Sequence, residues 1–175
     1  GLELYQLYLQ EENPEKAEAV IDSLILNHRN DLDLLYAKAE VQFSRQYWAD
    51  LLLTYKTIYL LDNDNIHILL KIYEIGTATG QLELVRDILW ELKGQSDKIE
   101  IVELLVESAS ALGEIQEAIV LIQDIINING SSDKLLMRLG ELYLQIEQFE
   151  EVINTLYPLY DIQNYNLDVL RMLLI

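Results

Sequence analysis

The sequence matches itself when it is shifted by about 33 to 34 residues, the spacing typical of helical-hairpin repeats. Leu105 and Leu139 are one such period apart, as are Ala118 and Val152, and one period earlier Val85 falls on Ala118. Four further pairs have the same offset: Gly113 with Glu147, Ile115 with Phe149, Ile122 with Leu156, and Ile125 with Leu159. Such a period, built from two apolar helical patterns, predicts stacked helical hairpins that each bury apolar surface only against their neighbours.

Each repeat contains two stretches with the spacing of an amphipathic helix. After Asn13, which can cap a helix, and Pro14, which suits the first helical position, apolar residues recur at i, i+3, i+4, i+7 and i+8 from Ala17. We expect a single array of five hairpins, followed by an extra first helix. The predicted repeats cover residues 1–31, 32–65, 66–98, 99–132 and 133–166, and the extra helix covers 167–175.

Three local features qualify this pattern. The two halves of the second repeat fit frames that differ by one residue, which predicts an irregular turn around Ser44–Gln46. Asp62–Asn65 offers alternate oxygens but lacks the glycine and the closing glutamate of a calcium loop, so we interpret it as a polar turn. The last second helix should run from Phe149 to about residue 162, with a kink or an end near Tyr157 because of Pro158.

The charge balance excludes several classes of partner. The chain has 175 residues, with 30 acidic and 12 basic side chains and a formal charge of −18. Nucleic acids and anionic membranes are bound through Lys and Arg that release counterions, so we predict neither partner. The apolar runs are too short to span a membrane, which predicts no membrane insertion. The chain has no cysteine, which excludes disulfides and cysteine zinc sites.

The sequence also lacks a constellation for catalysis. It has two histidines, His28 in a predicted turn and His67 near the start of a first helix. Adjacent carboxylates such as Glu150 and Glu151 point about 100° apart on a helix. The stretch 76–80 has glycines but no lysine to reach a phosphate. We therefore predict a protein that is not an enzyme and that has no cofactor or metal site.

The period and its anchor residues resemble the tetratricopeptide repeat. The match that begins at Asp133 has Leu136, Leu139, Gly140 and Tyr143 in the first helix and Phe149 at the start of the second. The match from Ile99 has Leu105, Ala109, Gly113, Ile115 and Ala118. The resemblance implies an all-α, right-handed superhelical solenoid of antiparallel helix pairs. Related helical-hairpin solenoids share this physics and are the alternative. Val85 and Val152 replace a small alanine of the family pattern, which predicts looser hairpin crossings.

In tetratricopeptide arrays the groove lined by the first helices usually holds an extended or helical peptide. The resemblance therefore nominates groove positions in four repeats. They are Leu35, Ala39 and Phe43 in the second repeat, His67, Leu70 and Glu74 in the third, Glu100, Glu103 and Glu107 in the fourth, and Lys134, Met137, Glu141 and Leu144 in the fifth. The chaperone-docking members of the family hold a peptide carboxylate with Lys and Asn. The matching places here hold Leu2 and Gln6, Leu35 and Ala39, and Leu70 and Glu74. We therefore do not expect that subclass.

Two functional hypotheses follow. In the first, the groove is an acidic, partly apolar cradle for a protein segment rich in Lys or Arg. The competing interpretation of the glutamates is that they solvate an exposed face of an acidic protein.

In the second hypothesis the array is a structural or assembly module that self-associates or packs on other domains of its own chain. Its eleven tyrosines and two tryptophans favour contact surfaces. We expect Trp48 and Trp90 to be packed between repeats. The apolar end at residues 173–175 is a candidate contact, which allows a homo-oligomer. Because Gly1 stands where an initiator methionine would be and an apolar pattern runs to Ile175, we expect a piece of a longer protein.

Overall fold

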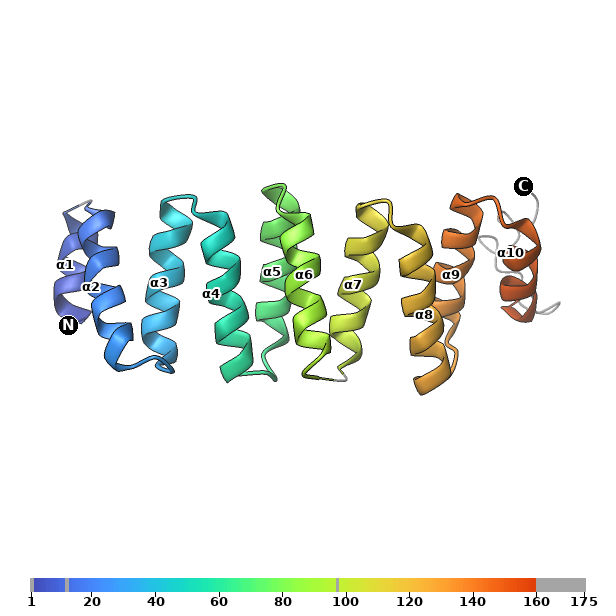
Figure 1. The fold of residues 1–175 in the computed structure, drawn as a ribbon, viewed down its shortest axis with the longest axis horizontal. Helices are drawn as coiled ribbons and strands as arrows, with labels where there is room; N and C mark the ends of the chain where they lie inside the picture. The colour runs from blue at the N-terminus through green and yellow to red at the C-terminus, as the bar shows by residue number, and fades with distance from the viewer. Residues whose placement is uncertain (1, 12, 97, 160–175) are drawn as a thin grey trace. The chain divides into compact units, whose positions relative to one another are not determined.

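The computed structural model describes residues 2–11, 13–96 and 98–159, and these contain ten α-helices, one short 3₁₀ helix and no strand (Figure 1). The predicted extra helix at 167–175 lies outside the described residues. The fold class is an all-α helical solenoid, as predicted. Contacts between residues divide the chain into two compact units, Gly1–Leu92 and Lys93–Ile175.

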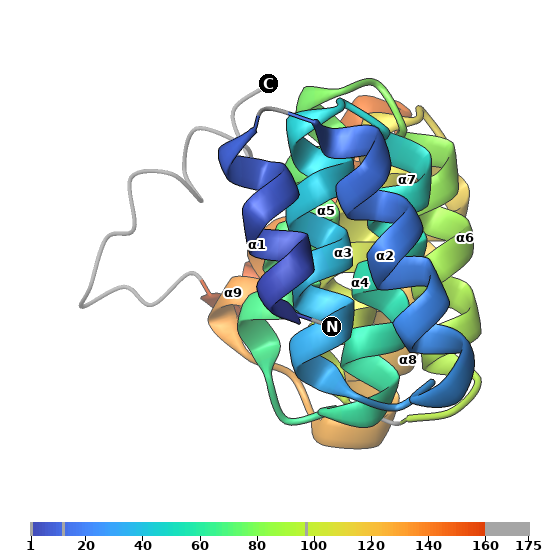
Figure 2. The same cartoon turned by 90° about the vertical axis from the view of Figure 1, so that its left-hand side faces the viewer.

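Unit 1 is built from three antiparallel helix pairs. Its helices are α1 (Leu2–Gln10), α2 (Pro14–Asn27), α3 (Leu32–Ser44), α4 (Trp48–Leu61), α5 (Ile66–Ala78) and α6 (Leu82–Lys93). Viewed end-on, α1 and α5 lie on one side of the unit and α2 and α6 on the other (Figure 2). The first helices of the hairpins thus form one layer of this unit and the second helices form the other.

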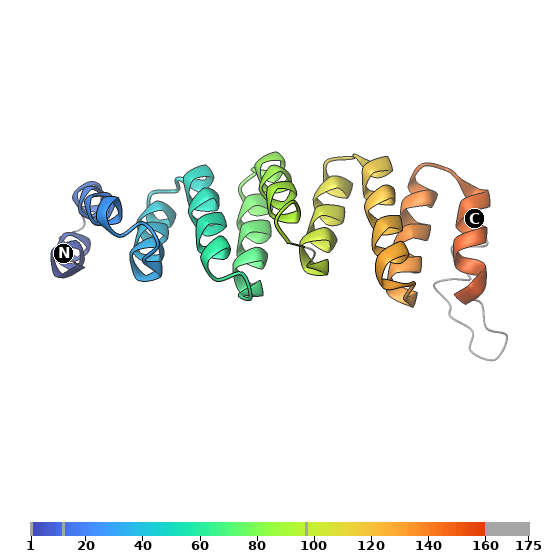
Figure 3. The same cartoon turned by 60° about the horizontal axis from the view of Figure 1, so that its bottom comes forward.

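Unit 2 contains two further pairs (Figure 3). Its helices are α7 (Ile99–Ala111), α8 (Ile115–Asn129), α9 (Asp133–Gln145) and α10 (Phe149–Leu156), followed by the 3₁₀ helix Tyr157–Leu159. The predicted end near Tyr157 is confirmed, because α10 stops at Leu156. Pro158 has no backbone N–H and crowds the preceding turn, so the helix tightens into 3₁₀ geometry instead of continuing. The expectation that α10 continues to about residue 162 is therefore wrong.

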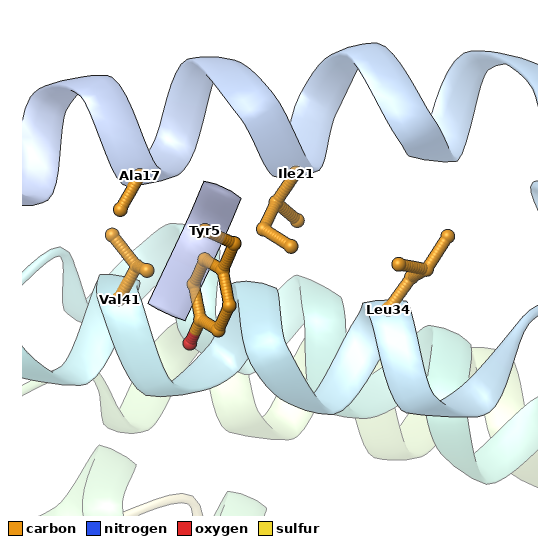
Figure 4. Packing of buried hydrophobic residues seen from close by; sticks show 5 residues of the cluster. All are labelled: Tyr5, Ala17, Ile21, Leu34 and Val41. Carbon is orange, nitrogen blue, oxygen red and sulfur yellow. The ribbon is translucent and has the colours of Figure 1, made fainter. Parts of the chain in front are cut away.

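The core runs between successive helices and has no single centre. Tyr5 of α1, Ala17 and Ile21 of α2, and Leu34 and Val41 of α3 are buried against one another (Figure 4). These side chains come from two hairpins, so burying them joins the first repeat to the second. This is how a solenoid gains stability, since each repeat covers the apolar face of the next one.

Small residues let the two helices of a hairpin approach closely. A Cβ placed on Gly76 of α5 would overlap Cγ2 of Val85 on α6. A Cβ on Gly140 of α9 would lie 2.8 Å from two side-chain carbons of Leu156 on α10. The expectation that Val85 loosens its crossing is wrong, because Gly76 on the facing helix removes the volume that Val85 adds.

The turns inside the last four hairpins share one backbone conformation. Gln46, Gly80, Gly113 and Glu147 all have positive φ, of 60°, 73°, 80° and 57°. The residue after each of them donates its N–H to a carbonyl five residues earlier, from Tyr47 to Gln42, Gln81 to Gly76, Glu114 to Ala109 and Gln148 to Tyr143. This is the left-handed helix ending that glycine favours. The expectation of an irregular turn at Ser44–Gln46 is wrong. This turn has the same backbone conformation as the other three and differs from the turns at Gly80 and Gly113 only in residue type.

Both tryptophans are less buried than the sequence predicts. Trp48 is partly buried, and its ring meets that of Phe43 edge-on with 5.5 Å between centroids. Trp90 is 38% exposed, so it is not enclosed between repeats as predicted. None of the described helices is both long and apolar enough to cross a membrane.

Candidate functional site

A glutamate occupies the same place on four first helices. Glu40 of α3, Glu74 of α5, Glu107 of α7 and Glu141 of α9 recur with the period of the repeat, and each stands at the same distance from the first residue of its helix. With the residues three or four positions away, they lie on one face of each helix. We call these faces the first-helix surfaces. That of unit 1 comprises Tyr36, Glu40 and Phe43 with His67, Leu70 and Glu74. That of unit 2 comprises Glu100, Glu103 and Glu107 with Lys134, Met137, Glu141 and Leu144.

In the second repeat, the exposed positions of the first-helix surface lie one residue after those assigned from the sequence. Leu35 is only 5% exposed and Ala39 is buried as well, so neither offers a side chain to a ligand. Tyr36 and Glu40 are the exposed residues at these places. The error has a physical source. The sequence suggested a one-residue slip within this repeat, whereas its turn has the same length and conformation as the others. Phe43 is 54% exposed on this surface.

On α5 the three nominated residues His67, Leu70 and Glu74 are exposed. They stand at the places that Asp33, Tyr36 and Glu40 occupy on α3, one repeat earlier. Among the described residues, Glu74 has no ion-pair partner. Unit 1 thus exposes a carboxylate beside large apolar side chains on each of two neighbouring first helices.

Glu40 is tied to the preceding repeat. The hydroxyl of Tyr5 donates to Glu40 Oε2 at 3.0 Å and to the backbone carbonyl of Ala37 at 3.2 Å. Burial raises the pKa of Tyr5, and the hydrogen bond to Glu40 and the charge of Glu40 raise it further. The neutral phenol therefore fixes the position of one carboxylate on the surface of unit 1.

Tyr55 of α4 interacts with residues of two first helices, α3 and α5. Lys71 of α5 places its ammonium 5.6 Å from the centre of the Tyr55 ring, which is within reach of a cation–π contact. Burial raises the pKa of Tyr55, and its electrostatic interaction with Tyr36 of α3 adds to the shift. The buried Tyr55 ring therefore lies next to the positive charge of Lys71.

Unit 2 differs, because bases of α9 neutralise part of its acidic surface. Lys134 Nζ lies 3.1 Å from Glu103 Oε1. The guanidinium of Arg138 binds two carboxylates, with 2.8 Å from Nη2 to Glu107 and 3.0 Å from Nη1 to Glu141. Exposed pairs of this kind each contribute about 0–1 kcal/mol to stability. Their main effect is on the electrostatics of the surface.

These ion pairs change the predicted acidic cradle. Three of its four glutamates in unit 2 have a basic partner, and Glu100 has no ion pair within the part of the chain that is described. Arg138 was missed from the sequence, although it stands three residues before Glu141 and so on the same helix face. The apolar residues Met137 and Leu144 are partly buried. A ligand of this surface would meet charges that are already paired.

The arrangement can present carboxylates, aromatic rings and aliphatic side chains to another chain. Across residues 2–11, 13–96 and 98–159, no group of three or more His, Cys, Asp or Glu side chains is placed to hold a metal ion.

Comparison with solved structures identifies the architecture as the tetratricopeptide-repeat fold. MamA from Desulfovibrio magneticus RS-1 aligns with a TM-score of 0.52 at 13% identity, over 89% of each chain. A tetratricopeptide-repeat protein of Thermus thermophilus aligns at 0.56 and 16% identity, over 99% of this chain and 97% of its own. YrrB, a tetratricopeptide-repeat protein with an unusual peptide-binding site, aligns at 0.56 and 14% identity, over 95% and 87%.

No protein-family model matches the chain, and neither does any curated protein sequence. The sequence-based prediction of a tetratricopeptide repeat is confirmed at the level of the fold. At these identities the likeness concerns the backbone architecture, so the function has to be argued from the surfaces.

Proposed function

We propose that this chain is a non-catalytic protein-interaction module whose first-helix surfaces bind a peptide or protein segment that carries Lys or Arg. The observation that carries the proposal is the recurrence of a glutamate at the same place on four first helices, flanked in unit 1 by exposed Tyr36, Phe43 and Leu70. Carboxylates would bind basic side chains, and the apolar groups would gain free energy by leaving water.

Unit 1 offers the more complete surface. Its large apolar side chains are exposed, and Glu74 has no basic partner among the described residues. In unit 2, Lys134 and Arg138 occupy the carboxylates that a basic segment would need, so such a segment would have to compete with them. The net charge of −18 favours encounter with basic partners and disfavours nucleic acid. YrrB has a peptide-binding site on a similar backbone, which adds support.

The test uses a fluorescent peptide that alternates Lys with Leu, and a matched peptide with Glu in place of Lys. Fluorescence anisotropy at low and high salt measures binding. We expect the Lys peptide to bind and the Glu peptide not to bind. The double variant Glu40→Gln/Glu74→Gln should weaken binding by about tenfold, since removing two charge contacts costs on the order of 1–2 kcal/mol. Gln at position 40 still accepts the Tyr5 hydrogen bond.

The matched control is Asp50→Asn/Glu83→Gln, which removes the same charge from the second helices α4 and α6. This control should bind like the unchanged chain. If both double variants lose affinity equally, net charge alone explains binding and the proposed site is wrong. If Glu40→Gln/Glu74→Gln binds normally, the ligand does not use this surface.

The alternative is a structural or assembly module, and the second helices of unit 1 supply an observation in its favour. Leu26 of α2 and Leu53 of α4 are exposed, and they line a shallow groove floored by Leu35 and by Gln42, which accepts a 2.8 Å hydrogen bond from Thr54. Sedimentation at increasing concentration in high salt distinguishes the two functions. Association that persists in high salt and disappears with Leu26→Ser/Leu53→Ser favours assembly.

A further inference from the structure

Unit 1 has a groove on the side of its second helices. The groove lies between α2 and α4, is floored by α3 and has a volume of about 420 Å³. We call this surface, with Leu26, Arg29, Gln42, Asp50 and Leu53, the outer groove. Leu26 is 70% exposed and Leu53 is 44% exposed. Exposed leucines around a hollow gain free energy when another chain covers them.

The floor of the outer groove is polar. Gln42 and Thr54 are 2% and 7% exposed, and the Thr54 hydroxyl donates to Gln42 Oε1 at 2.8 Å. One repeat later the same places hold Gly76 and Ile88, both buried, so the fold does not require a polar pair there. Among the described residues, the amide nitrogen of Gln42 has no hydrogen bond. Because a buried donor without an acceptor is unfavourable, this amide indicates a contact with another chain.

Two unpaired charges of opposite sign lie at opposite ends of the outer groove. Arg29 comes just before α3 begins, and Asp50 lies in the first turn of α4, just after α3 ends. Since α3 has 13 residues, its length of roughly 20 Å separates them. Neither has an ion pair within the described ranges. Lys38, which also lines the groove, is already paired with Asp22 at 2.7 Å.

This order of side chains is complementary to itself. Leu26 lies at the end of α2 that leads to Arg29, whereas Leu53 lies in the half of α4 that contains Asp50. A second copy turned by a twofold rotation brings Arg29 of each copy to Asp50 of the other, and Leu26 of each to Leu53 of the other. Each copy has a formal charge of −18, so two copies repel unless the charges that face each other attract. The outer groove supplies such attractions.

We propose that two copies of this chain associate through their outer grooves, in a twofold-symmetric pair with Leu26–Leu53 packing and Arg29–Asp50 ion pairs. The Gln42 amide of each copy then faces the end of α2 in the other copy, where the last carbonyls of the helix can accept its hydrogen bond. The proposal specifies the contacts of the assembly function. It does not rest on the proposed peptide binding, which uses the first-helix surfaces.

The test uses Arg29→Asp and Asp50→Arg, each of which places like charges opposite each other in the pair. Sedimentation equilibrium of the full chain at physiological salt measures the dissociation constant of the dimer. We expect the unchanged chain to dimerise and each variant to raise the dissociation constant at least about tenfold, because both ion pairs of the dimer are lost. A chain that stays monomeric at every concentration would overturn the proposal, as would variants that dimerise like the unchanged chain.

A mixture of the two variants separates this pairing from effects of net charge or folding. In a mixed pair, position 29 of each copy again faces an opposite charge at position 50. The mixture should therefore dimerise with about the affinity of the unchanged chain, although each variant alone dimerises weakly. A mixture that dimerises no better than the separate variants would overturn the proposal.

The matched controls are Lys16→Asp and Glu83→Arg, which make the same charge changes at exposed residues of α2 and α6 outside the outer groove. Each control should dimerise like the unchanged chain. If the controls lose dimerisation as much as Arg29→Asp and Asp50→Arg do, net charge explains the effect and the proposed pairing is wrong.

Discussion

Gly76 of α5 faces Val85 of α6 so closely that a single added methyl group would overlap the valine side chain. Val85 is fully buried, and Leu52 of the preceding hairpin also lies close to the glycine. The pair is therefore part of a three-helix contact, in which the absence of one side chain makes room for two others. In this repeat the small residue lies on the first helix, and the facing position of the second helix holds a valine.

Gly76→Ala should destabilise unit 1, because the new methyl group has no space. We expect the free energy of unfolding to fall by about 1–3 kcal/mol, the usual cost of overpacking a core. Chemical denaturation measures the change. In the double variant Gly76→Ala/Val85→Ala the loss should be smaller than the sum of the two single losses. Thr77→Ala, at an exposed neighbour, should change stability by no more than about 0.5 kcal/mol. Additive losses would contradict the proposed overlap.

Gln46→Gly and Glu147→Gly should each stabilise the chain. Both residues have a left-handed backbone, which L-residues with a side chain adopt at a cost and glycine adopts freely. We expect a gain of about 0.5–1 kcal/mol in each case, seen as a higher denaturation midpoint. The reverse changes, Gly80→Ala and Gly113→Ala, should destabilise by about 1 kcal/mol at equivalent turns. If the substitutions to Gly and the substitutions to Ala change the free energy of unfolding in the same direction, the turns are not equivalent.

Arg138→Gln should make the surface of unit 2 more receptive to basic ligands. The change removes the cation that binds Glu107 and Glu141, and it should lower stability by less than about 1 kcal/mol because both pairs are partly exposed. Affinity for the Lys–Leu peptide should rise roughly two- to fivefold, with a steeper dependence on salt. Arg29→Gln removes the same charge from the turn after α2 and serves as the control. Equal gains from both variants would mean that only net charge matters.

Stability should fall at alkaline pH because three tyrosines hold their protons more tightly in the folded chain. Burial is the main cause of the raised pKa of Tyr5, Tyr55 and Tyr143. Above the ordinary pKa of 10.0 the unfolded phenols ionise while the folded ones do not, so the unfolded state binds fewer protons and stability declines as pH rises. Below that pH the contribution is fully present.

Denaturation at neutral pH and above pH 10 measures this decline. Tyr5→Phe should lower stability at neutral pH by about 1 kcal/mol, through loss of the hydrogen bond to Glu40, and should make the alkaline decline shallower. Tyr157→Phe, at an exposed position, should leave the decline unchanged. An alkaline decline that Tyr5→Phe does not alter would exclude Tyr5 as a contributor.

The fold could be predicted from the sequence because burial in a solenoid repeats with the chain. Residues such as Leu105 and Leu139 meet equivalent neighbours in successive hairpins, so their spacing carries the architecture. The surface was less predictable. A misread turn at Gln46 shifted the assignment from Tyr36 and Glu40 to Leu35 and Ala39, since one residue on a helix turns the side chain by about 100°.

The ion pairs of the surface could not be read from the period. Arg138 binds Glu107, which belongs to the preceding repeat, and that contact depends on the packing of α9 against the earlier hairpin. Comparing repeats does not reveal this contact, because the places that match Arg138 on α7, α5 and α3 hold Leu104, Lys71 and Ala37. Contacts of this kind follow from side-chain length and rotamer, which differ among repeats even where the backbone recurs.

The shared turn conformation determines how a chain of this kind can change its length. Inserting one residue beside Gln46, Gly80, Gly113 or Glu147 would rotate the following helix by about 100° and move its apolar face out of the core. Adding a whole hairpin keeps the apolar face of the following helix directed into the core. We therefore expect this chain to tolerate added length only in steps of a complete repeat.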